Sequence, residues 1–370
     1  MENLKNNIKR IDLPLFISVI ILTVIGNILV ASATASYSGG KMQVIIQICA
    51  SIIGLILCLA IALYDYEFIA SKWLYIIGID VFLLVLVLVL GIGGEEVGSK
   101  SWIRVGPISV QPSEFVKIGF IVSFAYQLEK YKDRINEFKI VLGCLLHIGA
   151  MVFLIMLQPD FGTTMVFTAT FIIMIFLSGI SWKYIVSAIG VVIASVPILW
   201  FFVFKDYQKN RILTFFNPEL DTQVSGYHVM QSKTAIGSGE IFGEGLFKGI
   251  LTQNEFLPAK HTDFIFAVGC EELGFIGASV IIGLIVFIVV RCFVIAFKAK
   301  DVLGSFIAIG IGAMLMVQSL ENIGMTIGIT PVTGITLPFM SYGGSSLLTN
   351  FIAIGLVLNV KVRSKKINFM

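Results

Sequence analysis

The sequence predicts an all-α, polytopic integral membrane protein with about ten transmembrane helices. Apolar residues make up 57% of the 370 residues and charged residues only 13%, about half the charged share of an ordinary globular protein. A bilayer-crossing helix needs about 20 mostly apolar residues, so ten would use about 200. Thirty Phe and only nine Pro favour long helices over the short alternating strands of a transmembrane barrel. A soluble enzyme, a disordered chain and a fibre are therefore excluded.

Ten apolar stretches are predicted as membrane spans from their length and their low charge. In chain order they are 13–35, 43–63, 73–92, 113–128, 138–157, 162–179, 183–204, 267–297, 302–326 and 343–361. The first follows Lys5, Lys9 and Arg10, as a signal peptide would. Its apolar run is too long for one, and nine further spans follow, so we expect an uncleaved first helix.

The distribution of Lys and Arg predicts the orientation of these spans. With a cytoplasmic N-terminus, the inside segments carry sixteen of the 26 Lys and Arg residues and the short outside loops carry three. Six more lie in one long outside segment, 205–266. The preference of Lys and Arg for cytoplasmic loops holds for short loops and does not constrain a segment of this length. Both termini are therefore expected in the cytoplasm. The net charge of +3 is small and gives no reason to expect a nucleic-acid partner.

This orientation places the odd-numbered connections, which hold most of the Gly, Pro, Trp and clustered polar residues, outside. The connection at 93–114 reads GGEEVGSKSWIRVGPISVQPSE and includes Gln111. Trp102 beside Arg104 is either an ordinary interfacial anchor pair or a sugar-stacking ring next to a phosphate clamp. Glu114 and Lys117 share a helix face. At a membrane edge such charges either pair structurally or line a wet cavity.

The next outside connections carry further polar candidates. Asp160, in the turn QPDFG, caps the following helix in its simplest role. The long segment 205–266 opens with KDYQKNRILTFFNPELD, which includes Arg211 and suits an amphipathic interfacial helix. Lys248 follows in a stretch whose glycines permit sharp turns and close approach of a ligand. Those glycines are Gly237, Gly239, Gly243, Gly245 and Gly249.

The end of the long segment, AKHTDFIFAVGCEELGFIGA, holds three acids at the entry to the eighth span. Asp263 lies at the entry itself, and Glu271 and Glu272 follow it. Asp263 is either a helix N-cap or a carboxylate base in a partly desolvated cleft, where its pKa can be tuned.

The last outside connection reads NIGMTIGITPVTGITLPFMSYGGSS and includes Ser341. Its prolines and glycines break helices at membrane depth, where irregular backbone is tolerated only against protein or a wet cavity. Glu321 lies nearby in the ninth span, and Asp80 lies in the third. Each is a functional candidate, although a buried hydrogen bond explains either one equally well.

Six motifs together resemble the SEDS family, which comprises RodA, FtsW and their sporulation relatives. They are KSWIRVGPISVQPSE, QPDFGT, YQKNRILTFFNPE, GYHVMQSKTAIGSGEIFGEG, LPAKHTDFIFAVGCEELGFIGA and NIGMTIGITPVTGITLPFMSYGGSS. The match extends over most of the chain and predicts one SEDS-type transmembrane domain, 1–370. The sequences QSKTAIGSG, LTQ and KHTDFIFA are closer to those of RodA than to those of FtsW. Glu321 departs from the family, in which an uncharged residue is more usual there.

The resemblance implies a peptidoglycan glycosyltransferase. Such a protein polymerises lipid II, a polyprenyl-pyrophosphate-linked disaccharide peptide, into β-1,4 glycan strands at the outer face of the bacterial cytoplasmic membrane during elongation and shape maintenance. The implied partners are lipid II, membrane lipid and a class B penicillin-binding protein that crosslinks the product. A divalent cation, Mg²⁺ or Mn²⁺, is a candidate helper for pyrophosphate departure, and no other cofactor is predicted.

The family's essential acid falls on Asp263, and we hypothesise that it is the general base. The expected substrate-binding residues are Trp102, Arg104, Gln111, Glu114, Lys117, Asp160, Arg211, Lys248, Glu272 and Ser341.

Two other functions stay open. A lipid II flippase would suit ten spans and intramembrane acids, but the polar residues concentrate at one face and no internal repeat is visible. A non-catalytic scaffold for a penicillin-binding protein would not need Asp263 in a cleft. The sequence does not distinguish roles in elongation, division and sporulation.

Overall fold

The computed structural model describes residues 10–37, 39–93, 100–106, 108–198 and 225–364, with single positions at 201 and 209. The helices are α2 (Leu13–Ala33), α3 (Gly40–Leu63), α4 (Tyr66–Ser71), α5 (Trp73–Leu90), α6 (Pro112–Lys130), η1 (Lys132–Arg134), α7 (Phe138–Met156), α8 (Phe161–Leu177), α9 (Trp182–Ile198), α11 (Ser225–Ser238), α12 (Ile250–Gln253), α13 (Ile265–Phe297), α14 (Val302–Ile327) and α15 (Gly344–Arg363). Two short strands, β1 (Ile103–Val105) and β2 (Ile108–Val110), pair antiparallel.

A helix lies at each of the ten ranges predicted as spans, so the all-α membrane fold is confirmed. In the described part of the chain, seven helices are long and apolar enough to cross a membrane: α2, α3, α5, α7, α13, α14 and α15. The other three are α6, which carries charges near both ends, and α8 and α9, each of 17 residues. That these three also cross the membrane stays a prediction.

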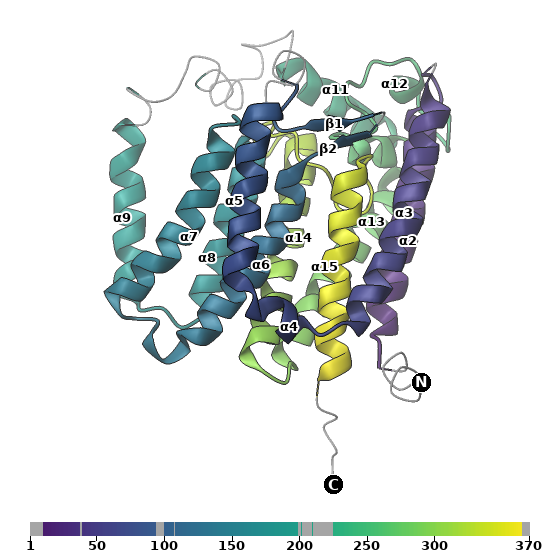
Figure 1. The fold of residues 1–370 in the computed structure, drawn as a ribbon. Coiled ribbons are helices and arrows are strands. Elements are labelled where there is room, and N and C mark those ends of the chain that lie inside the picture. Colours follow the sequence, from purple (N-terminus) through teal and green to yellow (C-terminus); the bar gives the residue numbers. More distant parts are fainter. Residues whose placement is uncertain are drawn as a thin grey trace.

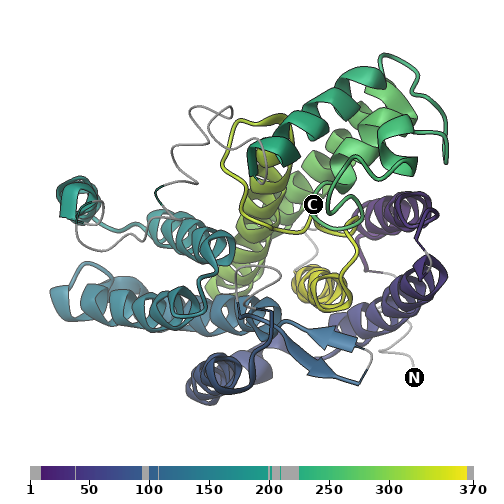
Figure 2. The same cartoon turned by 90° about the horizontal axis from the view of Figure 1, so that it is seen from above.

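The bundle is built around α14 and α15. Of their most apolar stretches, 78% and 83% of residues are buried, against 17% for α5 at the periphery. Figure 2 shows α15 surrounded by other helices and α9 standing apart from them. Small residues bring α15 close to α3, because a β carbon on Gly355 would lie 2.8 Å from the Cys58 carbonyl oxygen. Such close backbone approach is the usual way in which helices associate within a membrane.

The two ends of the bundle differ in structure, as Figure 1 shows. One end carries the β1–β2 hairpin, α11 and α12. At the other end lie α4, the start of α2 and the end of α15. Ion pairs connect different helices at this second end, including Arg291 with Asp12 and Lys300 with Glu67. Irregular structure therefore collects at one end, as the sequence predicts.

Candidate functional site

Asp263 lies in a tight turn, Ala259–Phe264, directly before α13. The amides of Asp263 and Phe264 donate to the carbonyl of Ala259 at 3.1 and 3.2 Å, and the Thr262 hydroxyl reaches the same oxygen at 3.2 Å. Phe264 is the N-cap of α13, and no side chain caps that helix end. The alternative in which Asp263 is only an N-cap is therefore wrong.

The Asp263 carboxyl is partly buried and faces an irregular loop, residues 328–343. A β carbon on Gly334 would lie 3.6 Å from Asp263 Oδ2. Burial raises the pKa of Asp263 from 3.8 to about 6, although a hydrogen bond with Thr262 offsets part of the increase. At neutral pH the group is thus mostly ionised but more basic than an ordinary Asp, which suits a general base.

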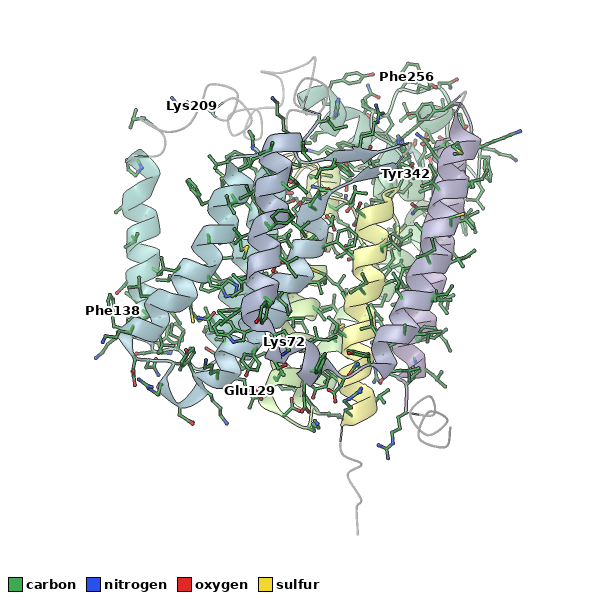
Figure 3. The ribbon with its side chains drawn as sticks, viewed as in Figure 1. Lys72, Glu129, Phe138, Lys209, Phe256 and Tyr342 are labelled. Carbon is green, nitrogen blue, oxygen red and sulfur yellow. The ribbon has the colours of Figure 1, made fainter. Side chains whose placement is uncertain are left out.

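Two buried side chains fix this turn against the 328–343 loop. Asn322, in α14, donates from Nδ2 to the carbonyls of Asp263 at 2.8 Å and Ile335 at 2.6 Å. The Ser341 hydroxyl donates to the Thr262 carbonyl at 2.6 Å and accepts from the Leu337 amide at 2.7 Å. Because both of its bonds are used within the protein, Ser341 is better suited to hold the turn than to bind substrate. Figure 3 labels its neighbour, Tyr342, at this end of the bundle.

A second group of polar side chains lies at the start of α6 and α8. Lys117 Nζ and Glu114 Oε2 form an ion pair at 2.9 Å, with 2% and 5% of the side chains exposed. Asp160 caps α8 by accepting from the Thr163 amide at 3.0 Å, which confirms the capping role. It also accepts from Gln111 Nε2 at 3.2 Å. Burial raises the pKa of Asp160, and the nearby Glu114 carboxylate adds to the increase.

Glu321, the residue that departs from the family pattern, faces this second group from α14. Its side chain interacts electrostatically with Lys117 and Asp160. It is buried, with 6% of its surface exposed, and its Oε2 atom has no hydrogen-bond partner in the described part of the chain. Three carboxyl groups therefore interact with one ammonium group in the protein interior, and this excess of negative charge favours binding of a ligand or a proton.

The β1–β2 hairpin holds Trp102 and Arg104 at the same end. Arg104 pairs with Ser109 across the strands, and the Trp102 carbonyl accepts from the Ile92 amide at 2.8 Å. The Gln111 amide then joins the hairpin to α15 by donating to Ser345 Oγ at 3.1 Å. Among the described residues, neither the indole nor the guanidinium has a hydrogen-bond or ion-pair partner, which leaves both side chains available to a ligand.

The glycine-rich loop, residues 239–249, approaches protein rather than an open cleft. At Gly274 (φ 65°, ψ −167°) α13 is interrupted, and the loop hydrogen-bonds the exposed backbone. The Phe275 amide donates to the Glu240 carbonyl at 2.8 Å, and the Glu244 amide donates to the Glu271 carbonyl at 2.9 Å. A β carbon on Gly243 would lie 2.3 Å from the Glu272 carbonyl oxygen. The glycines let the loop come close enough to hydrogen-bond the backbone groups that the break in α13 leaves unpaired at membrane depth.

The carboxylates of Glu271 and Glu272 accept hydrogen bonds within this same part of the structure. The Glu271 carboxylate accepts from the amides of Leu251 and Thr252 at 2.7 and 3.1 Å and so caps α12. Glu272 accepts from Ser32 Oγ and from Gln253 Nε2. These contacts favour a structural role for Glu272, and its role as a substrate ligand stays a prediction. Lys248 is exposed just before α12. Arg211 and the expected interfacial helix lie outside the described residues.

Two buried polar residues in or against the Asp263 turn are absent from the predicted site. Lys260 is fully buried, and its ammonium group donates to Ser36 Oγ at 2.8 Å and to the Thr252 carbonyl at 2.6 Å. A lysine in a loop normally marks the surface, so no sequence signal pointed to this burial. Asn322 is different, because a polar residue within an apolar span is a signal that could have found it.

The comparison with known families decides what this chain is. The model of the FtsW, RodA and SpoVE family, described as cell cycle protein, matches residues 13–366. The chain belongs to this family. The resemblance drawn from the motifs is thus confirmed, and it spans almost the whole chain.

Individual relatives in the family carry different names. The chain is 40% identical over 361 residues to stage V sporulation protein E of Bacillus subtilis, covering 96% of this chain and 98% of the relative. It is 35% identical over 359 residues to peptidoglycan glycosyltransferase MrdB of Escherichia coli K12, covering 97% and 95%. A solved chain from a study of polymerisation and crosslinking by a peptidoglycan synthase complex superposes with a TM-score of 0.81 at 28% identity, covering 95% of this chain and 97% of that one.

Proposed function

We propose that this protein is a peptidoglycan glycosyltransferase that polymerises lipid II, with Asp263 as its general base. One observation carries the proposal: the Asp263 carboxyl is partly buried, has a pKa raised to about 6 and lies beside a glycine of an irregular loop, on a turn whose backbone Asn322 holds. A relative that is 35% identical is named a peptidoglycan glycosyltransferase, which supports the assignment of the reaction.

The proposed reaction is a single displacement. Asp263 takes the proton from the 4-hydroxyl of the acceptor GlcNAc, and that oxygen forms a bond to C1 of the donor sugar. The bond between C1 and the pyrophosphate oxygen breaks, and the lipid pyrophosphate leaves with both electrons. Attack on an α-linked donor inverts C1 and gives a β-1,4 link.

The leaving pyrophosphate gains negative charge, which cationic groups must stabilise. We assign this role to Arg104, which has no ion-pair partner among the described residues, and to Lys117. Lys248 and Arg211 are further candidates. In the described part of the chain, no group of three or more His, Cys, Asp or Glu side chains is placed to hold a metal ion. Asp160 is moreover already hydrogen-bonded by Thr163 and Gln111. The residues described do not form a site for Mg²⁺ or Mn²⁺, and we derive no step through one.

We further propose that this end of the bundle faces outward from the bacterial cytoplasmic membrane, with both termini inside. The excess of Lys and Arg in the opposite connections supports this orientation. A class B penicillin-binding protein is the proposed partner. The similarity to a chain from a peptidoglycan synthase complex that couples polymerisation to crosslinking supports it. We also propose a role in elongation, because the motif sequences QSKTAIGSG, LTQ and KHTDFIFA are closer to RodA than to FtsW.

The test is polymerisation of purified lipid II by the detergent-solubilised protein with its partner, read as glycan ladders on a gel. We expect ladders from the wild type and from Asp133→Asn, an exposed acid at the opposite end, and none from Asp263→Asn. Ladders from Asp263→Asn would remove Asp263 as the base. Failure of the folded wild type would reject the glycosyltransferase and favour a flippase or a scaffold.

A further inference from the structure

A groove of about 410 Å³ lies between α5, α6 and α7, at the end of the bundle opposite Asp263. Its polar lining consists of Trp73, Gln127, Tyr131, Lys139 and His147, and the remaining lining residues are apolar or glycine. Figure 3 labels Lys72 and Phe138, which directly precede two of these residues, near this end. The groove has no part in the proposed glycosyl transfer.

The wall of the groove contains a chain of buried polar groups. His147 Nδ1 lies 2.8 Å from Gln127 Oε1, and His147 Nε2 lies 3.3 Å from Ser123 Oγ. These contacts use the Gln127 oxygen, but its amide nitrogen has no partner among the described residues. Gln127 is 6% exposed, and a β carbon on Gly143, which lines the groove, would lie 3.7 Å from that nitrogen. The amide nitrogen of this largely buried side chain is therefore left open toward the groove, where an acceptor can reach it.

The rim of the groove is cationic. Lys139 lines it and is exposed, with no ion-pair partner in the described part of the chain. The Lys130 ammonium lies 5.3 Å from the Trp73 ring centroid and 5.4 Å from that of Tyr131, so it is held beside the groove by cation–π contacts. Arg134, which lies in η1 between α6 and α7, is already paired with Glu137. None of the described lining residues is acidic.

The groove opens toward lipid. On α7, which is long and apolar enough to cross a membrane, the lining residue Leu146 is 65% exposed, and Leu142 and Leu145 on the same helix are also exposed. Trp, Tyr and Lys together at one level of a bundle mark the interface between hydrocarbon and headgroups. Basic pockets between membrane helices recognise anionic lipid headgroups by charge and by hydrogen bonds.

We infer that this groove binds one anionic phospholipid from the leaflet on the side of α4. Its phosphodiester accepts from the Gln127 amide and pairs with Lys139 and Lys130. One acyl chain lies along Ile77, Leu146 and Ala150. Glycine at 143 is needed because a larger side chain would fill the space next to the amide.

The test is native mass spectrometry of the whole protein in detergent, titrated with phosphatidylglycerol or phosphatidylcholine. We expect the wild type and Lys132→Gln, an exposed lysine outside the groove lining, to retain one phosphatidylglycerol. Lys139→Gln and Gly143→Leu should weaken that binding about tenfold or more, and phosphatidylcholine should bind about tenfold more weakly than phosphatidylglycerol. Thermal unfolding of each variant controls for folding. If Gly143→Leu does not fold, the binding result for Lys139→Gln, a change at an exposed position, tests the site by itself.

Three results would overturn the inference. Equal phosphatidylglycerol binding by the wild type and Lys139→Gln would remove the site. Equal binding of the two lipids would remove the requirement for negative charge. Displacement of phosphatidylglycerol by equimolar polyprenyl phosphate would make the occupant a polyprenyl lipid instead.

Discussion

Two ion pairs with the same spacing lie at opposite ends of the molecule. Glu114 and Lys117, at the Asp263 end, are 2.9 Å apart with 5% and 2% of their side chains exposed. Arg134 and Glu137, at the α4 end, are 2.7 Å apart with 63% and 47% exposed. Both pairs join residues i and i+3. The geometry is thus similar, but only the first pair is removed from water.

The difference shows where the protein places charge that folding does not need. Exposed pairs contribute little to stability, because water solvates each partner almost as well. A buried pair carries a large desolvation penalty, and apolar side chains of the same size would often be more stable. The Asp263 end nevertheless buries Glu114, Lys117, Asp160, Lys260 and Glu321. Buried charge gathered in this way is frequent at functional sites.

Replacing the charge of Asp263 should give the largest effect. Because general-base catalysis is worth about 10²–10⁴-fold, Asp263→Asn should reduce strand synthesis at least about a hundredfold. The variant should also be slightly more stable at neutral pH, since burial that raises the pKa of Asp263 to about 6 penalises the ionised form. Lipid II polymerisation and thermal unfolding measure the two effects.

Stability and activity should depend on pH in opposite directions through the titration of Asp263. Its folded pKa, about 6, lies above the ordinary value of 3.8, so its effect on stability becomes less favourable as pH rises between those values and is constant above them. The wild type should show this slope and Asp263→Asn should not. Strand synthesis should rise with pH through about 6, as the base loses its proton. A loss of both activity and stability in Asp263→Asn would instead make the residue structural.

The second effect concerns the buried pair itself. Lys117→Met leaves Glu114 without its partner and close to the buried carboxyl group of Asp160. Removing one partner of a buried pair costs about 3–5 kcal/mol, so a large drop in unfolding temperature is expected. The double variant Glu114→Gln with Lys117→Met should recover much of the loss, because no charge of the pair is left unpaired. A double variant no more stable than Lys117→Met would show that the loss comes from packing.

The sequence predicts that Glu114 and Lys117 share a helix face but not what surrounds them. Apolar runs locate a helix at each of the ten predicted ranges, because such a helix needs only local length and low charge, but they do not predict the short α4, η1, α11 and α12. The i, i+3 spacing of Glu114 and Lys117 likewise predicts their contact. Burial is set by which helices pack together, and no local pattern shows that α14 places Glu321 beside Lys117. The glycines at 239–249 were expected near a ligand, but their partner is the break in α13 at Gly274, which depends on contacts about 30 residues away along the chain.

Asn322 should give an intermediate effect. Asn322→Ala removes the donor from the buried carbonyls of Asp263 and Ile335, and an unsatisfied buried group costs about 1–3 kcal/mol. The Asp263 turn would lose its anchor to α14, so strand synthesis should fall more than stability alone explains. Gln318→Leu is the matched control, because this amide is buried in the same helix with no partner among the described residues. We expect that control to be neutral or stabilising, whereas equal losses in both variants would contradict an anchoring role.

Breaking the exposed pair of Arg134 and Glu137 should have the smallest effect on stability and on strand synthesis. Arg134→Gln removes a bidentate contact that is shorter than the Glu114–Lys117 contact, so distance alone would predict the larger loss here. Because both side chains remain in water, we expect no measurable change in unfolding temperature, and none in strand synthesis. Glu137→Gln should behave in the same way, and added salt should not alter either result. A loss as large as that of Lys117→Met would show that burial does not decide the energetics of these pairs. Asp263 would then be the one buried acid of this end for which a functional role is supported.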